Sequence, residues 1–368
     1  MTDPLGIQSS LPPLYAGWLS EALPGAIPAE TKATCENCAM CQQNANTGSQ
    51  AMFFNPNTKC CTYLPELANF LVGRILAEPD ASTVPGRDRL EEWIDRGIAV
   101  TPFGAVKPPL YDLLYTQATD FFGKSEAMLC PYYIKEGGLC GIWQHRNSIC
   151  ATWYCKHNRG AVGFTFWRTL QKMLGMAERY LAVWCILQLD LGATALKKLF
   201  PVENPNQAGA MRTPLNAKQL DGIKDEDNYR VLWGNWLGRE KDYYRVCGQL
   251  VSGLSWEQVL DIGGIELRMM DRLTLEAYQN LVSEEIPPRL QSGTFQIIRS
   301  GSNRHLVETY SIYDPLSMPR QLMEVLDYFD GRPTEEAVQA IYDEKDLNLT
   351  AGLIRKLTDF QVLRPTDS

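Results

Sequence analysis

Apolar residues recur at helical spacing through much of the first third of the chain, between loops that contain proline and glycine. A short helix is expected at residues 15–23, within a proline-rich N-terminal segment. The apolar positions that follow Pro65 repeat at intervals of three and four residues and predict another helix. Further helices are expected at residues 87–98 and 110–122.

The middle of the chain has the strongest helical pattern. Residues 164–189 are apolar on nearly every side, which is typical of a buried helix. Further helices are expected at residues 225–250, 256–260 and 271–282. Cys185 and Cys247 lie inside these patterns, and we interpret both as small core residues.

The last part of the chain changes to strand-like runs at residues 294–299 and 305–311, joined by a Ser-Gly-Ser-Asn turn signal. This pattern predicts a β-hairpin. Three helices are expected after it, at residues 318–328, from the N-cap Thr334 to Tyr342, and at residues 349–360. A closing strand would complete a winged-helix arrangement.

These elements predict a mainly α fold with small β elements. A chain of 368 residues has room for two or three domains of ordinary size. We divide it into an N-terminal arm (1–30), a cysteine-rich metal-binding domain (31–160), a helical middle domain (161–290) and a winged-helix-like domain (291–368).

The formal net charge of -8 argues against nucleic acid as a partner, because such binding depends on basic residues that neutralise phosphates. The most apolar stretch is far shorter than the roughly 20 residues that span a bilayer, so no membrane partner is expected. No basic segment followed by an apolar one marks a secretory signal. We therefore expect a cytoplasmic protein.

Cysteine is concentrated in one third of the chain. In a reducing cytosol, thiols at this density more often bind metal or act in catalysis than form disulfides. We assign no catalytic residue, and we expect metal ligands among nine cysteines: Cys35, Cys38, Cys41, Cys60, Cys61, Cys130, Cys140, Cys150 and Cys155.

The run Cys35-Glu-Asn-Cys38-Ala-Met-Cys41 can direct three sulfurs towards a common centre, as iron–sulfur binding runs do. Its fourth ligand would come from Cys60 or Cys61. A second set would then contain Cys130, Cys140, Cys150 and Cys155. Alternatively, Cys130, which precedes a proline, would complete the first run, and the sequence leaves these partitions open.

The metal is expected to be an iron–sulfur cluster, in one or two copies, with zinc as the alternative. Four thiolates select either of these over calcium or magnesium. Three cysteines within seven residues favour iron–sulfur, since zinc sites usually have two separated Cys-x2-Cys pairs. Cys130 and Cys140 would lie close together in a small hairpin that turns at Glu136-Gly-Gly. His145 and His157 are interpreted as surface residues or as neighbours of the ligands.

A known pattern of cysteines is partly present. Cys130-Pro and Gly138-Leu-Cys140-Gly-Ile-Trp, continuing through Arg146 to Cys150, with a Cys60-Cys61 pair upstream, resemble the YkgJ-like cysteine-cluster family. That resemblance implies zinc or iron chelation over about residues 35–155. The chain departs from the pattern where the first run stops at Cys41 and where Asn147 stands in place of proline.

The end of the chain carries a second resemblance. Asp330-Gly-Arg-Pro-Thr334-Glu-Glu-Ala-Val, followed by Leu353-Ile-Arg-Lys-Leu357 and Val362-Leu, is similar to the PqqD-like winged helix that binds leader peptides. The resemblance implies a peptide or protein partner for residues 291–368, bound by strand addition to the predicted hairpin. A winged helix used only for packing or dimer contact is the alternative.

Two functional hypotheses follow. The first is an iron–sulfur protein in redox chemistry or in peptide or protein modification, with a C-terminal module that recruits the partner. The second is a non-catalytic scaffold or adaptor stabilised by zinc. The sequence leaves open whether the protein is an enzyme.

Overall fold

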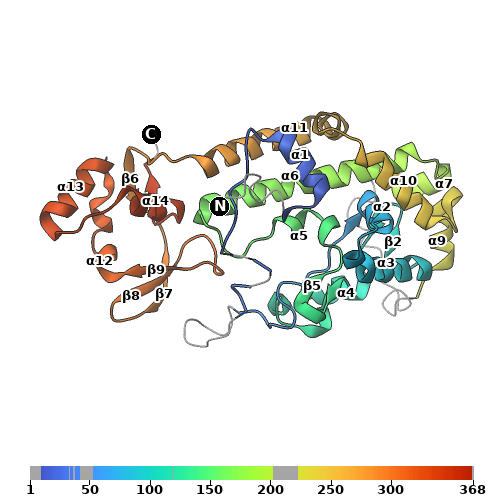
Figure 1. Cartoon of the computed structure of the whole chain (residues 1–368), viewed down its shortest axis with the longest axis horizontal. Helices are drawn as coiled ribbons and strands as arrows, with labels where there is room; N and C mark the ends of the chain where they lie inside the picture. Colours follow the sequence, from blue (N-terminus) through green and yellow to red (C-terminus); the bar gives the residue numbers. More distant parts are fainter. Residues whose placement is uncertain are drawn as a thin grey trace, which may run out of the picture. The chain divides into compact units, whose positions relative to one another are not determined.

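The computed structural model describes residues 10–32, 34–35, 38–41, 53–117, 119–201 and 223–366, and these are mainly helical with small antiparallel sheets (Figure 1). The mainly α prediction is therefore confirmed. The chain forms two compact units, each built from three separate segments. The first contains Met1–Ala26, Phe53–Thr152 and Gln171–Asp271, and the second contains Ile27–Met52, Trp153–Leu170 and Arg272–Ser368. This division does not test the four domain ranges, which stay predictions.

Two long helices contribute residues to both units, α6 (Gly160–Gln188) and α11 (Trp256–Val282). The other helices of the first unit are short: α1 (Pro13–Ala22), α2 (Asn69–Ala77), α3 (Val84–Arg96), α4 (Pro109–Gln117), α5 (Ser148–Thr152), α7 (Ala193–Leu199), α9 (Glu226–Trp233) and α10 (Glu240–Ser252). Its strands have two residues each: β1 (Leu67–Ala68), β2 (Val100–Thr101), β3 (Gly104–Ala105), β4 (Tyr133–Ile134) and β5 (Leu139–Cys140). They form an antiparallel sheet in the order β1-β3-β2 and a β4-β5 hairpin.

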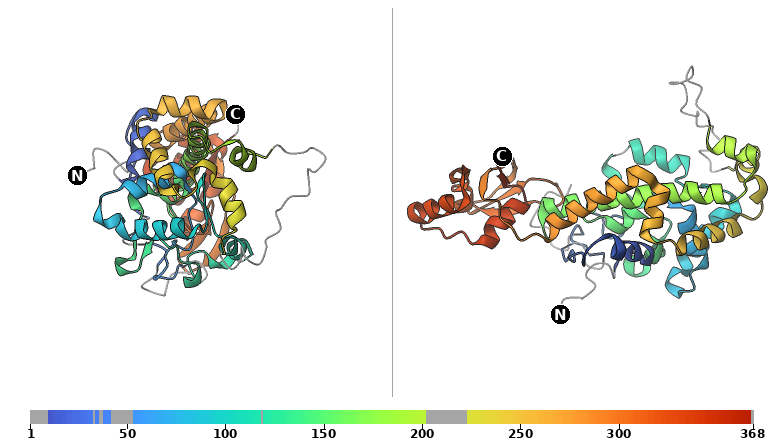
Figure 2. Two further views of the ribbon diagram at one scale, coloured as in Figure 1. Left: turned by 90° about the vertical axis from the view of Figure 1, so that its right-hand side faces the viewer. Right: turned by 90° about the horizontal axis from the view of Figure 1, so that it is seen from above.

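Helices α2 and α10 lie side by side because glycine faces glycine where they meet (Figure 1; Figure 2). A Cβ atom on Gly73 would lie 1.8 Å from the backbone oxygen of Tyr244 and 3.0 Å from the backbone nitrogen of Gly248. The Tyr244 hydroxyl also donates to the Thr101 carbonyl at 2.7 Å, which joins α10 to β2. The small sheet and the helix pair therefore form one packed layer that requires small residues at its centre.

Glycine also explains two differences from the predicted helices. The helix expected at 225–250 is divided, because Gly234 and Gly238 have φ of +46° and +79° between α9 and α10. The helices expected at 256–260 and 271–282 are longer than predicted and meet at a kink within α11, where Gly264 has the non-helical angles φ +63° and ψ -153°. Cys185 and Cys247 are fully buried, as predicted for core residues.

The second unit contains two small sheets. Strand β6 (Arg289–Ser292) is central in the order β10-β6-β11, with β10 (Asp330–Pro333) and β11 (Leu363–Pro365) as its neighbours. The other sheet has the order β7-β8-β9, with β7 (Gln296–Ser300), β8 (Arg304–Glu308) and β9 (Leu316–Pro319). Its helices are α12 (Arg320–Met323), α13 (Thr334–Lys345) and α14 (Ala351–Asp359).

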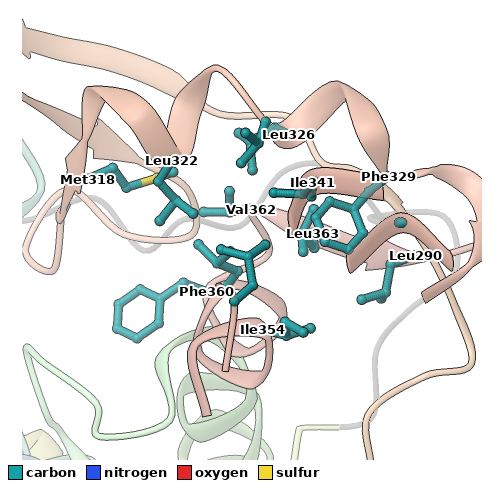
Figure 3. Packing of buried hydrophobic residues seen from close by; sticks show 14 of the residues in the cluster. Leu290, Met318, Leu322, Leu326, Phe329, Ile341, Ile354, Phe360, Val362 and Leu363 are labelled. Atoms are coloured by element: carbon teal, nitrogen blue, oxygen red, sulfur yellow. The ribbon is translucent and has the colours of Figure 1, made fainter. Parts of the chain in front are cut away.

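An apolar core holds these elements together. Figure 3 shows Leu326, Phe329, Ile341, Val362 and Leu363 converging from the helices and the closing strand. All five side chains are buried. Strand β6 adds Leu290, which is fully buried, so the core extends to the central strand.

Two predictions for this region are wrong, while the predicted hairpin is confirmed as β7 and β8. The helix expected at 318–328 is replaced by β9, the short α12 and a 3-10 turn at Leu326–Tyr328, because residues 316–319 pair with β8. Thr334 is the first residue of α13 and not its N-cap. Its hydroxyl donates instead to the Pro287 carbonyl at 2.9 Å, which ties α13 to the segment before β6.

Arg159, which directly precedes α6, contacts α14 and the end of α11 within the second unit. Its guanidinium donates to both carboxylate oxygens of Asp359 at 2.9 and 2.6 Å. Nη1 also donates to the carbonyls of Asn280, Leu281 and Ser283, at 3.1, 2.5 and 2.8 Å. The Arg159 and Asp359 side chains retain only 18% and 11% of their exposure. This arginine therefore satisfies both a carboxylate and the carbonyls at the end of α11.

In the described ranges, no helix is both long and apolar enough to cross a membrane.

Candidate metal centre

Four cysteines of the first unit, carried by four different segments, interact through their charges. Cys60 lies in a loop before β1, Cys130 before β4, Cys140 at the end of β5, and Cys150 in α5. The Cys130 thiol interacts electrostatically with the other three, and Cys150 interacts with Cys140 and Cys60. We call Cys60, Cys130, Cys140 and Cys150 the first-unit thiol cluster.

The loop that carries Cys60 is fixed on both sides by buried threonines. The Thr58 hydroxyl donates to the Gly123 carbonyl at 3.0 Å, and the Thr62 hydroxyl accepts from the Gly123 N–H at 2.7 Å. The Tyr111 hydroxyl donates to the Thr62 carbonyl at 2.6 Å. Both threonines are fully buried, so the backbone around Cys60 is held in one position.

Two hydrogen bonds join this loop to the β4-β5 hairpin. The N–H of Cys130 donates to the Cys61 carbonyl at 2.7 Å, and Lys59 Nζ donates to the Gly138 carbonyl at 3.1 Å. Cys140 pairs with Tyr133 across the hairpin. The predicted hairpin is therefore confirmed, and it brings Cys140 back towards Cys130.

Two glycines allow α3 to pack closely against the residue after Cys140. A Cβ atom on Gly86 would lie 2.2 Å from the Gly141 carbonyl oxygen. One on Gly141 would lie 2.9 Å from the Gly86 nitrogen. The position of Cys140 is thus determined by a backbone contact with a helix as well as by the hairpin.

The surroundings of Cys150 include a cation. The guanidinium of Arg146 stacks over the Trp143 ring at 3.4 Å and donates to the Cys150 carbonyl at 3.4 Å. It also donates to the Ser10 carbonyl at 2.8 Å. The Asn147 side-chain oxygen accepts from the Cys150 N–H at 3.0 Å. The Asn147 side chain therefore helps to position the backbone of Cys150.

Burial is the largest influence on the thiols, and it raises the pKa of Cys130 and of Cys150 above the usual range. The neighbouring thiols raise both pKa values further, because thiolates in one place repel each other. A hydrogen bond from the Tyr132 backbone N–H lowers the pKa of Cys130, and the charge of Arg146 lowers that of Cys150. A bound cation would offset the repulsion and stabilise the thiolates.

The buried side chain of Glu178 contacts the first residue of α5. Glu178 accepts from the Ser148 N–H at 2.5 Å, from the Ser148 hydroxyl at 3.0 Å and from the Tyr15 hydroxyl. Burial raises the pKa of Glu178 to about 7. Glu178 is not among the residues predicted from the sequence, although an acidic residue within a helix that is apolar on nearly every side is a signal that could have identified it.

This pKa predicts that Glu178 makes stability depend on pH. Between the ordinary carboxyl pKa of 4.5 and about 7, the folded protein holds a proton that the unfolded chain releases, so stability falls as pH rises. The contribution is on the order of 3 kcal/mol. Glu178→Gln cannot ionise, so its urea unfolding free energy is expected to fall less than that of the wild type between pH 5 and pH 8. Parallel curves would contradict the prediction.

The other predicted ligands are placed differently. The second unit contains Cys35, Cys38, Cys41 and Cys155. The backbone carbonyl of Cys61 accepts a hydrogen bond from the Cys130 N–H. The first-unit thiol cluster contains Cys60, whereas the sequence pattern predicts Cys60 or Cys61 as the fourth ligand of the Cys35–Cys41 run.

Neither histidine is a surface residue, which corrects that part of the interpretation. His145 is buried, and its Nε2 lies 2.9 Å from Glu78 Oε2. His157 is also buried. Its backbone N–H donates to the Asp314 carboxylate at 3.2 Å, and its ring Nδ1 lies 3.4 Å from the Tyr310 hydroxyl. Burial lowers the pKa of His157 to about 4.

Over the parts of the chain that the structure describes, no group of three or more His, Cys, Asp or Glu side chains is arranged to hold a metal ion. The donor chemistry of the first-unit thiol cluster is nevertheless that of a soft metal site, because all four groups are sulfur. Comparisons with known proteins found no matching family model, curated protein or solved structure.

Proposed function

We propose that this protein binds an iron–sulfur cluster through Cys60, Cys130, Cys140 and Cys150. The observation that carries the proposal is that the segments of these cysteines are held in one compact unit, where the Cys130 N–H donates to the Cys61 carbonyl at 2.7 Å and the Cys130 thiol interacts electrostatically with the other three. Four sulfur donors from loops that are individually fixed by hydrogen bonds are a suitable ligand set for a thiolate-bound metal.

The residues around the cluster have definable roles in this proposal. The Tyr132 N–H and the Arg146 guanidinium stabilise negative charge on Cys130 and Cys150. The Cys61 carbonyl and the Lys59 ammonium hold the hairpin in register with the Cys60 loop. When bound, an iron–sulfur cluster supplies electron transfer, and the surrounding hydrogen bonds and charges would tune its reduction potential.

We further propose that this redox centre serves the modification of a peptide or protein that residues 291–368 recruit. Supporting this, β7 is the outer strand of its sheet and pairs only with β8 among the described strands. All five of its residues are exposed, including Ile297 and Ile298. An exposed outer strand with apolar side chains can accept an extended peptide by strand addition.

Metal content tests the first part of the proposal. The full-length protein, purified without oxygen, is expected to contain iron and acid-labile sulfide and to absorb visible light. Cys60→Ser is expected to lose one complete equivalent, because the remaining three thiols cannot enclose the metal. Cys61→Ser is the matched control, and it should retain the wild-type content.

The outcomes separate the two functional hypotheses. A colourless protein with stoichiometric zinc that Cys60→Ser removes would support the zinc-stabilised scaffold instead. Unchanged metal content in Cys60→Ser, with circular dichroism like that of the wild type, would refute Cys60 as a ligand.

Peptide recruitment predicts a role for the side chains of β7. Ile297→Asp is expected to weaken the binding of the full-length protein to an array of extended apolar peptides by about tenfold or more, since a charge replaces an apolar contact. Ile312→Asp is a matched control, because both isoleucines are 49% exposed and Ile312 lies outside β7. Equal binding by both variants would contradict recruitment through this strand.

A further inference from the structure

The sheet β7-β8-β9 of the second unit (Figure 1) has two faces, and the register of its strands assigns each side chain to one of them. Residues that pair across neighbouring strands lie on the same face. Val307 and Met318 are buried in the apolar core, so their face packs on the core. Ile297 pairs with Val307 and therefore lies on this core face, although it remains 49% exposed.

The opposite face of the sheet carries Arg299. This arginine pairs with Leu306, which pairs in turn with Ser317 on the next strand. The register shifts between Ile297 and Arg299, and this shift leaves Ile298 as an extra residue of the outer strand. Strand β7 therefore presents an apolar side chain on the core face and a cation on the other face.

The arginines of β7 and β8 are not neutralised by carboxylates of their own unit. Over the described ranges, the ion pairs of the second unit involve Arg159, Arg320, Arg332 and Arg355. Arg304 instead donates to the Ser317 hydroxyl at 2.9 Å and to the Ser317 carbonyl at 2.8 Å. Arg299 is exposed, so its positive charge is accessible to a partner.

This sheet is a basic region of an acidic chain. Residues 289–323 contain four arginines and two acidic residues, whereas residues 324–346 contain eight acidic and two basic residues. Of the two acidic residues in the first range, Asp314 is buried, and Glu308 is the last residue of β8, at the end away from the turn. The turn end of the outer strand, with Arg299, is therefore its positive end.

A strand that adds to β7 would continue the two faces of the sheet. Its side chains alternate, so one set lies beside Ile297 on the core face and the other lies beside Arg299. An apolar side chain beside Ile297 covers exposed apolar surface. A carboxylate beside Arg299 pairs with its cation, whereas a basic side chain there is repelled.

We infer that the partner of β7 is an acidic peptide segment in which apolar and polar residues alternate and a carboxylate lies beside Arg299. The inference rests on the recruitment proposed above and specifies the class of peptide that is recruited. It does not depend on the metal site, because no cysteine is part of this surface.

The binding of three matched peptides to the full-length protein, measured by fluorescence anisotropy, tests this class. Each peptide has about ten residues, enough to pair along a strand, and alternates valine with threonine. Glu, Gln or Lys stands at a central polar position. The wild type is expected to bind the Glu peptide about fivefold more tightly than the Gln peptide, and the Lys peptide about fivefold more weakly, as for one exposed ion pair. At about 1 M salt the differences should vanish.

A charge reversal at Arg299 tests the residue that selects the peptide. Arg299→Glu is expected to invert the order, so that the Lys peptide binds most tightly. Arg332→Glu is the matched control, because it changes the net charge equally at a 42% exposed arginine of β10, outside the sheet β7-β8-β9. The control should keep the wild-type order.

The outcomes separate the peptide class from recruitment itself. Equal affinities of the wild type for the Glu and Gln peptides, with weaker binding of both by Ile297→Asp, would overturn the acidic class and leave recruitment through β7 intact. An unchanged order in Arg299→Glu would overturn the role of Arg299. No binding of any of the three peptides by the wild type would overturn both the acidic class and recruitment through this strand.

Discussion

Replacing Gly73 with alanine is expected to destabilise the first unit by at least about 3 kcal/mol, beyond the usual cost of overpacking. The new Cβ would lie 1.8 Å from the Tyr244 carbonyl oxygen and 2.6 Å from its carbonyl carbon. Both atoms are backbone, so no side-chain rotation can relieve the overlap, and α2 and α10 must separate. Urea unfolding followed by circular dichroism measures the loss.

Gly17→Ala is the matched control for this substitution. Gly17 is exposed in α1 of the same unit, and a Cβ atom there meets nothing within 4 Å. Alanine should stabilise that helix by about 0.5–1 kcal/mol, because it restricts the unfolded chain more than glycine does. A Gly73→Ala protein as stable as the wild type would show that α2 and α10 do not make the close contact described above.

Replacing Arg159 with methionine is expected to destabilise the second unit by about 3–5 kcal/mol. The substitution leaves the Asp359 carboxylate largely buried and without its cation, and it removes the donor to the Asn280, Leu281 and Ser283 carbonyls. Arg159→Lys should recover only part of the loss, because an ammonium cannot make the two-point contact with Asp359. Denaturant unfolding of all three proteins gives the comparison.

The ion pair of Arg332 with Asp330 provides the control within the same unit. Their contact is 2.6 Å, but the side chains are 42% and 49% exposed. Arg332→Met is therefore expected to change stability by less than about 1 kcal/mol. If Arg159→Met had an equally small effect, its buried contacts would contribute little to the fold.

Local patterns in the sequence predicted the long and strongly periodic helices well. The apolar positions after Pro65 became α2, and the apolar run at 164–189 became most of α6. In such segments the local preference and the tertiary packing favour the same structure. Their bounds differ from the prediction by only a few residues, as expected for helix ends that fray.

Elements that depend on distant partners were not predictable in the same way. Residues 316–319 are a strand because β8 offers an edge to pair with, and β6 is a strand because β10 and β11 lie on both sides of it. Gln361 has φ +59°, which lets the chain turn sharply from α14 into β11. A periodicity argument considers each segment alone and cannot include such neighbours.

The candidate site shows the same division between local and distant information. Residue type and density identified the nine cysteines, but their spacing could not show which of them share a unit. Cys60 is closer in sequence to Cys41 than to Cys130, yet it belongs to the unit of Cys130. The grouping is decided by buried contacts such as those of Thr58, Thr62 and Glu178, which no spacing rule represents.

The segments of the two units alternate along the chain, and this order determines when each unit can fold during synthesis. Cys35, Cys38 and Cys41 leave the ribosome long before Trp153–Leu170 and Arg272–Ser368, which complete their unit. At roughly 5–20 residues per second, translation from Cys41 to Cys155 takes on the order of ten seconds. During that time, oxidants and competing metals can reach these three thiols outside a folded unit. These three thiols therefore depend on a reducing environment until residues 272–368 have been synthesised.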